Sequence, residues 1–558
     1  MGVRRNGAAA RTLMAAVAVV GLAGTACGPR GRVVSSHKAK HVKPVADAGW
    51  HIASRQPKDG ITGFADQTDV VPGGHVHFFV STRAGSYTVK AYRMGWYGGK
   101  GGGLAWHSRR HKGVKQADPT VSENTHTVAA PWKKSFTVGT EGWPEGAYLF
   151  VLKASDGSAH YVPLVLRSQT TSGKVVLVDA TATWQAYNAW GGYSLYHGPF
   201  NNPRRRATVV SFDRPYDGSG ANLFLSFERP AISYAEQLGL PIAYITSQDL
   251  ASEPDVLSGA RAVISLGHDE YWTSSMRDAV KAAREAGTNI AFLGANAVFR
   301  HIRFEEGPAG PNRVEVNYRT ETDPLMSSEP KEVTTNWREP PDPRPESVLT
   351  GALYECNPVN AAYVVPERAE WPLSAAHVDG GTKFKGLVGP EYDRVDPAYD
   401  TPRPITVLAH SPLTCHGRPS YADTSYYTVP SGAGVFDAGT MRWVCALGGG
   451  CRNHGVDAAA TRFVQDVTKA LLRAFATGPA AKTNAAIDNL DDITEVLGDA
   501  TVPRYVPKPR IRRHLETVPV PSLLPHPMTS VPPIKPSAVP KPKPKASTAS
   551  KPTPGATP

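Results

Sequence analysis

The chain of 558 residues has few cysteines, a modest share of charged residues and no long apolar run. Five cysteines and 20% charged residues exclude a disulfide-dense miniprotein and a highly charged, wholly disordered chain. The longest apolar run, residues 12–26, is shorter than the roughly 20 residues that a membrane-spanning helix needs. With 41% hydrophobic residues the chain can bury a sizeable core, and its length exceeds that of one ordinary domain.

Acidic residues are absent from the first 44 positions, and this uneven distribution decides what the net charge means. The formal charge is +12, yet residues 1–44 carry eight basic side chains and no acidic one, and residues 501–558 carry ten basic side chains and one acidic one. The rest of the chain therefore sums to −5. Because the positive charge belongs to the two ends, we expect no basic groove for DNA or RNA and no nucleic-acid partner.

The N-terminal segment, residues 1–27, predicts export. A positively charged stretch precedes an apolar run that ends in small residues, which is typical of a secretory signal peptide. Cys27 has Ala26 before it and Gly28 after it, as in a bacterial lipobox, although Gly24 stands where such a motif has leucine. We favour a lipid on Cys27 that anchors the protein to the outer face of the membrane, with plain secretion as the alternative.

The other four cysteines are expected to form disulfides, because an exported chain meets an oxidising environment. Cys445 and Cys451 flank a Gly-rich turn, which would leave Cys356 with Cys415. Four cysteines allow three connectivities, so the sequence leaves the pairing open.

Two structured domains are predicted between the ends of the chain. Residues 28–45 are short, basic and polar, and we interpret them as a tether. From 46 to 168 the hydrophobic pattern has a period near two, broken by Gly, Pro, Asp and Ser turns, which predicts an immunoglobulin-like antiparallel β-sandwich. Its predicted strands are residues 75–82, 87–94, 126–129, 135–138, 147–153 and 161–166.

The second predicted domain covers residues 173–478. Short, continuously apolar strands alternate with helical stretches, which favours a parallel α/β sheet. The predicted strands are residues 174–179, 207–212, 241–246, 261–266 and 289–293, and the predicted helices are 222–239, 274–286 and 458–475. In the helix 274–286, Ser275 with Asp278 fits a capping box and Gly287 a C-terminal stop. Residues 305–350 are rich in Pro, Glu and Arg and are expected to form a long excursion.

The C-terminal segment, residues 479–558, is predicted to be a disordered tail. Beyond residue 517 it consists mostly of Pro, Lys, Ser and Thr with few aromatic residues. Two interpretations stay open for it: contact with an anionic cell-wall polymer, or a solvated linker end with no partner.

Polar clusters follow three of the predicted strands. After 174–179 comes an aromatic and amide-rich segment, residues 183–196, and after 261–266 comes Gly-His-Asp-Glu-Tyr-Trp, residues 267–272. Residues 294–296, Gly-Ala-Asn, follow the strand 289–293. Because ligands of an open α/β sheet gather beyond the carboxyl ends of its strands, we expect these clusters to face one pocket.

Structural roles are the alternative for each of these residues. His268 and Glu270 could cap the helix that begins near residue 274, since acidic groups favour a helix N-terminus. Tyr187 and the tryptophans could fill the junction between the domains, which is the interpretation we prefer for Trp190. Asn296 could be a turn residue.

Familiar hydrolase and dinucleotide-binding signatures are missing. The sequence has no Gly-x-Ser-x-Gly elbow, no His-Glu-x-x-His and no Gly-x-Gly-x-x-Gly that opens a helix after the strand 174–179. The available groups are imidazole, carboxylate, phenol and carboxamide, and an oxygen-rich set of this kind suits a hard, Lewis-acidic cation.

The motifs resemble the C-terminal domain of the N,N-dimethylformamidase large (beta) subunit family and its exported relatives. The resemblance covers roughly residues 50–478, and its specific motifs are residues 183–196 and 267–272. The segments that carry it are residues 183–196, 267–272, 292–296 (Phe-Leu-Gly-Ala-Asn), 91–99, 389–393 and 439–443. It implies a β-sandwich followed by a glutamine-amidotransferase-like α/β domain.

The resemblance also implies a metal-dependent hydrolase of a small amide. In the family's enzyme two tyrosines and one glutamate hold a mononuclear iron. Glu270 matches the carboxylate ligand and Tyr187 one phenolate ligand, whereas His268 and Asn296 match pocket residues beside the metal. The implied cofactor is ferric iron, or otherwise another hard divalent or trivalent cation.

Two further assignments rest on the same resemblance. Tyr148, on the last-but-one strand of the predicted sandwich, is the preferred second tyrosine ligand, with Tyr193 and Tyr196 as rivals. Glu391 is the candidate general base.

Two functions follow as hypotheses. The first is an exported, lipid-anchored, metal-dependent hydrolase that acts on the C–N bond of a small amide. The second is a non-catalytic envelope protein whose sandwich and tail bind wall polymers and whose α/β domain is a degenerate enzyme.

Overall fold

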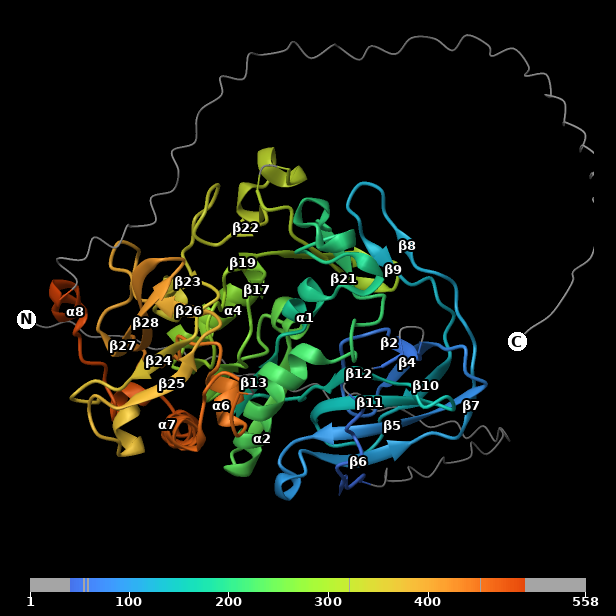
Figure 1. Cartoon of the computed structure of the whole chain (residues 1–558), viewed down its shortest axis with the longest axis horizontal. Coiled ribbons are helices and arrows are strands. Elements are labelled where there is room, and N and C mark those ends of the chain that lie inside the picture. The colour runs from blue at the N-terminus through green and yellow to red at the C-terminus, as the bar shows by residue number, and fades with distance from the viewer. Residues whose placement is uncertain (1–40, 54–55, 58–59, 321, 452, 497–558) are drawn as a thin grey trace, which may run out of the picture. The chain divides into compact units, whose positions relative to one another are not determined.

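The computed structural model describes residues 41–53, 56–57, 60–320, 322–451 and 453–496, and it is rich in β-structure arranged in several sheets (Figure 1). The predicted signal segment, Cys27 and the part of the predicted tail beyond residue 496 lie outside the described residues. Within the described part, the longest helices are too short or too polar to cross a bilayer.

The N-terminal part consists of two sheets that share one core. The larger sheet has the order β1-β6-β5-β11-β12-β3 with β7 beside β5, the smaller one has the order β10-β4-β2, and β8 pairs with β9. The strands are β1 Val45–Ala46, β2 Thr62–Ala65, β3 Asp69–Val70, β4 His75–Ser81, β5 Ser86–Met94, β6 Gly102–His107, β7 His111–Lys112, β8 Thr120–Val121, β9 Val128–Ala129, β10 Phe136–Gly139, β11 Gly146–Ala154 and β12 Ala159–Leu166. The pairing is antiparallel except between β12 and β3.

Alternation along β11 divides its side chains between two cores. Tyr148, Phe150 and Leu152 point into the core between the two N-terminal sheets. Leu149 and Val151 point the other way, into a core that they share with the following α/β part. Because neighbouring residues of a strand face opposite sides, β11 is buried on both faces. The alternation therefore places the Tyr148 side chain in the core between the two N-terminal sheets.

The C-terminal part is built around a seven-stranded sheet with the order β15-β13-β16-β18-β29-β28-β27. Its first five strands are parallel, and the β-hairpin β27–β28 adds an antiparallel edge. The strands are β13 Val175–Asp179, β15 Ile242–Thr246, β16 Ala262–Ser265, β18 Asn289–Phe292, β27 Ile405–Cys415, β28 Arg418–Thr428 and β29 Gly434–Asp437. The sheet is therefore mixed, whereas the sequence pattern favours a parallel one.

One predicted strand belongs elsewhere. Residues 207–212 contain β14, but β14 pairs antiparallel with β21 in a separate small sheet, so its assignment to the parallel sheet is wrong. The long excursion at 305–350 supplies β21 and most of β20 to this sheet, and β22 to a second small sheet. The small-sheet strands are β14 Val209–Ser211, β20 Arg303–Gly307 and β21 Gly310–Val316, then β17 Tyr271–Trp272, β19 Arg300–His301 and β22 Thr335–Asn336, and the pairs β23 Leu353–Cys356 with β26 Tyr392–Arg394 and β24 Ala361–Val364 with β25 Lys383–Val388.

Helices connect and cover these strands. They are α1 Thr181–Tyr187, α2 Arg229–Gln237, α3 Ser247–Ser252, α4 Ser274–Glu285, α5 Ser347–Thr350, α6 Trp443–Leu447, α7 Ala458–Thr477 and α8 Leu490–Val496, with a π-helix at Phe224–Glu228 before α2. The cap of α4 is Thr273, whose hydroxyl accepts a hydrogen bond from the Met276 N–H. The predicted capping box at Ser275 and Asp278 therefore lies too late in the chain, whereas Gly287 does follow the helix in a left-handed conformation.

Both ends of the described chain are more ordered than the sequence suggested. Val45 and Ala46 pair with β6, so the last residue of the predicted tether, Val45, belongs to the first sheet. Residues 480–496 hold a 3-10 turn and α8, and Asn489 exchanges hydrogen bonds with the backbone of Val407. The disorder predicted from residue 479 is wrong for this stretch.

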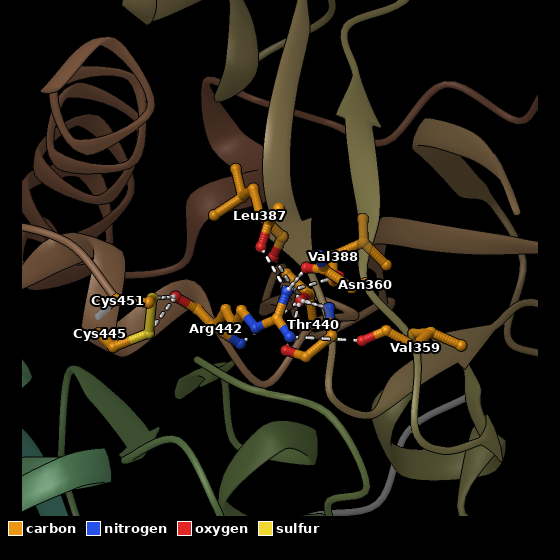
Figure 2. The surroundings of a disulfide bond; sticks show 10 residues. Val359, Asn360, Leu387, Val388, Thr440, Arg442, Cys445 and Cys451 are labelled. Atoms are coloured by element: carbon orange, nitrogen blue, oxygen red, sulfur yellow. Dashed lines mark hydrogen bonds between the residues drawn. A yellow bond between two sulfur atoms is a disulfide. The ribbon is translucent and has the colours of Figure 1, made fainter. Parts of the chain in front are cut away.

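The two disulfides have the connectivity that the Gly-rich turn suggested. Cys356 joins Cys415, and Cys445 joins Cys451. Figure 2 shows the second bridge beside Arg442, whose carbonyl oxygen lies 3.3 Å from the Cys445 sulfur. The Arg442 guanidinium donates to the backbone carbonyls of residues 386 and 388. Arg442 therefore connects the segment that carries this disulfide to β25.

Two glycines allow the ends of β16 and β18 to touch. A Cβ atom on Gly294 would lie 2.0 Å from the carbonyl oxygen of Gly267, and Gly267 itself has a left-handed φ of 75°. Any side chain at position 294 would therefore push apart the two turns that follow these strands.

Gly294→Ala is expected to destabilise the protein by about 1–3 kcal/mol, because the added methyl group meets rigid backbone rather than a movable side chain. Urea denaturation measures the change. Gly85→Ala is the matched control, since no atom lies within 4 Å of the position that a Cβ atom would take there. Equal stabilities of the two variants would contradict the close approach.

Candidate functional site

Helix α1 carries the first functional side chain, Tyr187, to the carboxyl edge of the sheet. The helix begins two residues after β13 and is buried along nearly its whole length. The Thr183 hydroxyl accepts hydrogen bonds from the backbone N–H groups of Glu270 and Tyr271, at 3.0 and 3.3 Å. Because these bonds fix the turn after β16 against α1, Tyr187 and Glu270 face one another.

Glu270 is the centre of the site. Its side chain is 1% exposed. The hydroxyls of Tyr187 and Tyr196 donate to its carboxylate at 2.7 and 2.8 Å. His268 Nε2 lies 3.3 Å from one carboxylate oxygen, and Arg300 Nε donates to the other at 3.3 Å. Four groups from separate segments therefore converge on one buried anion.

The surroundings set the ionisation of this cluster. Burial by itself raises the pKa of Glu270, but the hydrogen bond from His268 and the charge of Arg300 lower that pKa to about 2. Burial lowers the pKa of His268, whereas Glu270 and Glu391 raise it, and the net change is upward. Burial and the Glu270 charge hold the pKa values of Tyr187 and Tyr196 well above the usual range. The phenols are thus neutral and donate to a carboxylate.

The second tyrosine beside Glu270 is Tyr196, not Tyr148. Tyr148 is buried in the core between the N-terminal sheets, and its hydroxyl donates to the Pro144 carbonyl oxygen at 2.7 Å. The prediction that Tyr148 is the second tyrosine ligand is therefore wrong. Its side chain points to the face of β11 that lies away from the α/β part. Of its two rivals, Tyr193 stacks on His126, and Tyr196 contacts Glu270.

Asn296 and Glu391 form the adjoining part of the site. Asn296 Nδ2 donates to Glu391 Oε2 at 3.0 Å, and the Asn296 backbone N–H donates to Asp393 at 2.8 Å. Asn296 has a left-handed φ of 59°, so it is a turn residue as well as a site residue. Glu391 is close enough to act electrostatically on His268 and Tyr187. The structure therefore brings the three clusters predicted from the sequence together.

Sequence reasoning missed Arg300 and Asn357. Arg300 lies on β19, and its backbone N–H donates to the Glu270 carbonyl oxygen at 2.8 Å. Asn357 Nδ2 donates to Glu391 Oε1 at 3.0 Å, directly after the disulfide-bonded Cys356. Neither residue lies in a motif, and only the fold brings them to the site.

The structural alternatives fail for most of the cluster. His268 and Glu270 do not cap α4, because β17 intervenes and Thr273 is the cap. Trp190 does lie at a junction, as expected, since its ring meets that of Trp132 edge-on at 5.7 Å.

The donor atoms around Glu270 fit a hard cation. Two phenol oxygens and a carboxylate lie within hydrogen-bond distance of one another, with no thiol among them. Among the described residues, one group of His, Cys, Asp and Glu side chains has ligand atoms close enough to share a metal: Cys356, Cys415 and His416. Its two cysteines form a disulfide and so offer no thiolate.

Comparison with protein families agrees with the motifs. A family model described as N,N-dimethylformamidase beta subunit-like, C-terminal, matches residues 88–456, which is more than half of the chain. The chain belongs to this family. The match begins within β5 and ends before α7, so it includes every residue of the Glu270 cluster.

Other comparisons add little. No curated protein matches the chain. A solved structure of a Paenibacillus sp. cycloisomaltooligosaccharide glucanotransferase, complexed with cycloisomaltoheptaose, is 12% identical over 23% of this chain and 17% of that chain, with a TM-score of 0.14. A likeness this weak supports no conclusion about fold or function.

A pair of buried acids contacts the N-terminal part of α1. Asp179, the last residue of β13, and Glu228 are both buried and interact through their side chains. Glu228 Oε1 accepts hydrogen bonds from the Trp184 indole at 2.6 Å and from the Ala180 N–H at 3.1 Å. Burial raises the pKa of Asp179 to about 7 and that of Glu228 well above its usual range. The pair therefore retains a proton at pH values where the unfolded chain has lost it.

Asp179→Asn is expected to flatten the pH dependence of stability. The contribution of this pair to stability falls as pH rises from about 4 to about 7, because the native pair holds a proton that the unfolded chain releases, at up to about 1.4 kcal/mol per pH unit. The carboxamide cannot ionise, and Glu228 loses its acidic neighbour. Urea denaturation at pH 5 and pH 7 measures the slope, with the exposed Asp255→Asn as control. An unchanged slope would argue against the shared proton.

Proposed function

We propose that this protein is an exported, lipid-anchored and iron-dependent hydrolase of the C–N bond of a small amide. The observation that carries the proposal is the contact of the Tyr187 and Tyr196 hydroxyls with the Glu270 carboxylate, at 2.7 and 2.8 Å. Membership of the dimethylformamidase-like family supports the hydrolase class. The same membership, together with the two N-terminal sheets and the five parallel strands, supports an immunoglobulin-like sandwich followed by a glutamine-amidotransferase-like domain.

Tyr187, Tyr196 and Glu270 are the proposed metal ligands. Ferric iron, or another hard divalent or trivalent cation, would supply Lewis acidity to an amide carbonyl or to water at this point. The two phenols would lose their protons to become ligands, because the charge of a bound cation would oppose the burial and the Glu270 charge that raise their pKa values. Arg300 and His268 would remain beside the carboxylate and fix its orientation.

The neighbouring polar residues have the chemistry for proton transfer and charge stabilisation. His268, whose pKa is raised, can hold a proton next to Glu270, and Glu391 can accept one. Asn296 Nδ2 uses one hydrogen for Glu391 and has a second for the oxygen that gains charge as the amide carbonyl is attacked. Asn357 holds the other oxygen of Glu391 and so positions it.

Tyr187→Phe and Tyr196→Phe are each expected to weaken the visible charge-transfer band of the iron-loaded protein. Each should also bind iron at least about tenfold less tightly, because one phenolate ligand is lost. Metal analysis and absorption spectra of the purified protein test this, together with amine release from small formamides.

Tyr148→Phe is the matched control for these variants. It removes the same hydroxyl from a tyrosine that the fold keeps in the sandwich core, so the band should stay unchanged. A colourless, metal-free wild type whose Glu270→Ala variant behaves normally in the cell would instead support a non-catalytic envelope protein.

Localisation and partners belong to the same proposal. We propose that a lipid on Cys27 holds the protein at the outer face of the membrane, that a small amide is its substrate, and that the lysine-rich tail touches an anionic wall polymer. The charge distribution supports the last point, because the basic residues lie at the ends of the chain.

Cys27→Ala is expected to move the protein from the detergent phase to the aqueous phase in a Triton X-114 partition, because the thiol that carries the lipid is lost. Ala26→Ser is the control, since it keeps a small residue before the cysteine. A wild-type protein found in the aqueous phase would support plain secretion.

A further inference from the structure

A cavity of about 170 Å³ adjoins the Glu270 cluster through a shared residue, Tyr187. Tyr187 lines the cavity and also donates its hydroxyl to Glu270. The other lining residues include Trp184, Tyr216, Phe224 and Asp217. None of these last four residues has a role in the proposed hydrolysis.

The aromatic walls stand at steep angles to one another. The ring of Trp184 meets those of Tyr216 and Phe224 edge-on, with centroids 6.2 and 5.8 Å apart and interplanar angles of 75° and 76°. Trp184 and Tyr187 lie one helical turn apart on α1, Phe224 opens the π-helix, and Tyr216 lies in the loop before it. Several ring surfaces therefore border one small space.

The cavity also has one acidic lining residue, Asp217. Burial raises the pKa of Asp217, whereas the backbone N–H of Ala189 and the charge of Arg214 lower it. The Arg214 guanidinium donates to the backbone carbonyls of residues 188, 190 and 193, which hold it in place. The Trp184 indole N–H donates to Glu228 at 2.6 Å, which fixes the orientation of this ring.

We propose that this cavity binds a small alkylammonium group. Ring faces attract a cation through their quadrupoles, and a carboxylate in the same wall adds a direct charge partner. A neutral apolar group would gain no charge interaction with Asp217, whose burial the Ala189 N–H and the Arg214 charge already offset in part. The volume is close to that of a cavity that holds one benzene molecule, so it admits one such group rather than a polymer.

The cavity then suggests the substrate class, a step that rests on the proposed function. Tyr187 belongs both to the Glu270 cluster and to the lining of the cavity. An amide bound at the cluster would therefore extend a substituent into the cavity. The substrate would be an amide with an alkylammonium substituent. Binding of the ammonium group itself requires neither iron nor hydrolysis, so it can be tested when no activity is found.

Calorimetric titration of the full chain with choline tests the proposal, with 3,3-dimethylbutan-1-ol as the uncharged compound of the same shape. Choline is expected to bind saturably and at least about tenfold more tightly than the alcohol. Asp217→Asn should weaken choline binding about tenfold or more, whereas Asp379→Asn, the same change at an exposed position, should leave it unchanged.

A second pair of variants tests the rings. Tyr216→Phe keeps the ring face and should keep choline binding, and Tyr216→Leu removes the face and should weaken binding about tenfold. Circular dichroism shows which variants fold. If Asp217→Asn does not fold, the two Tyr216 variants test the proposal. Three results would overturn the proposal: no choline binding by the wild type, equal binding of the alcohol, or full choline binding by folded variants that lack the charge or the ring.

Discussion

The burial of one carboxylate, that of Glu270, is the constraint on which the rest of the site depends. Removing a carboxylate from water is costly unless hydrogen bonds and opposite charges replace the solvent. Here two phenols, an imidazole and a guanidinium do so, and they come from α1, the loop after it, the turn after β16 and β19. Loss of any one would leave part of a buried charge without a partner. The same four groups give the site its oxygen donors and its proton carriers, so stability and chemistry are coupled at this point.

Hydrogen bonds to the backbone help to hold these donors in place. Thr183 accepts two N–H groups from the turn that carries Glu270, and the N–H groups of Phe299 and Arg300 donate to the Glu270 carbonyl oxygen. Gly267 and Gly294 permit the neighbouring turns to touch. A parallel sheet brings the carboxyl ends of its strands to one edge, and these contacts convert that general property into a fixed arrangement of side chains.

The N-terminal sheets contribute support rather than reactive groups. Through Leu149 and Val151 they share a core with the α/β part, and through Trp132 they contact Trp190 near the site. The family match begins within β5, so the family includes part of this support together with the site. The disulfide at Cys356 has a comparable role, since the next residue, Asn357, holds Glu391.

The sequence by itself determined the local elements and the chemical groups. Periodicity located β4, β5, β10, β11 and β12, four of the five parallel strands and the helices α2, α4 and α7. The residues after the strands identified Tyr187, His268, Glu270 and Asn296 as neighbours. Tertiary structure alone decided that Tyr196 rather than Tyr148 meets Glu270, that β14 leaves the main sheet, and that Arg300 and Asn357 complete the site. The reason is physical. Local patterns record which face of an element is buried, whereas the pairing of β19, β21 and β23 with distant strands depends on contacts between segments that no local pattern relates.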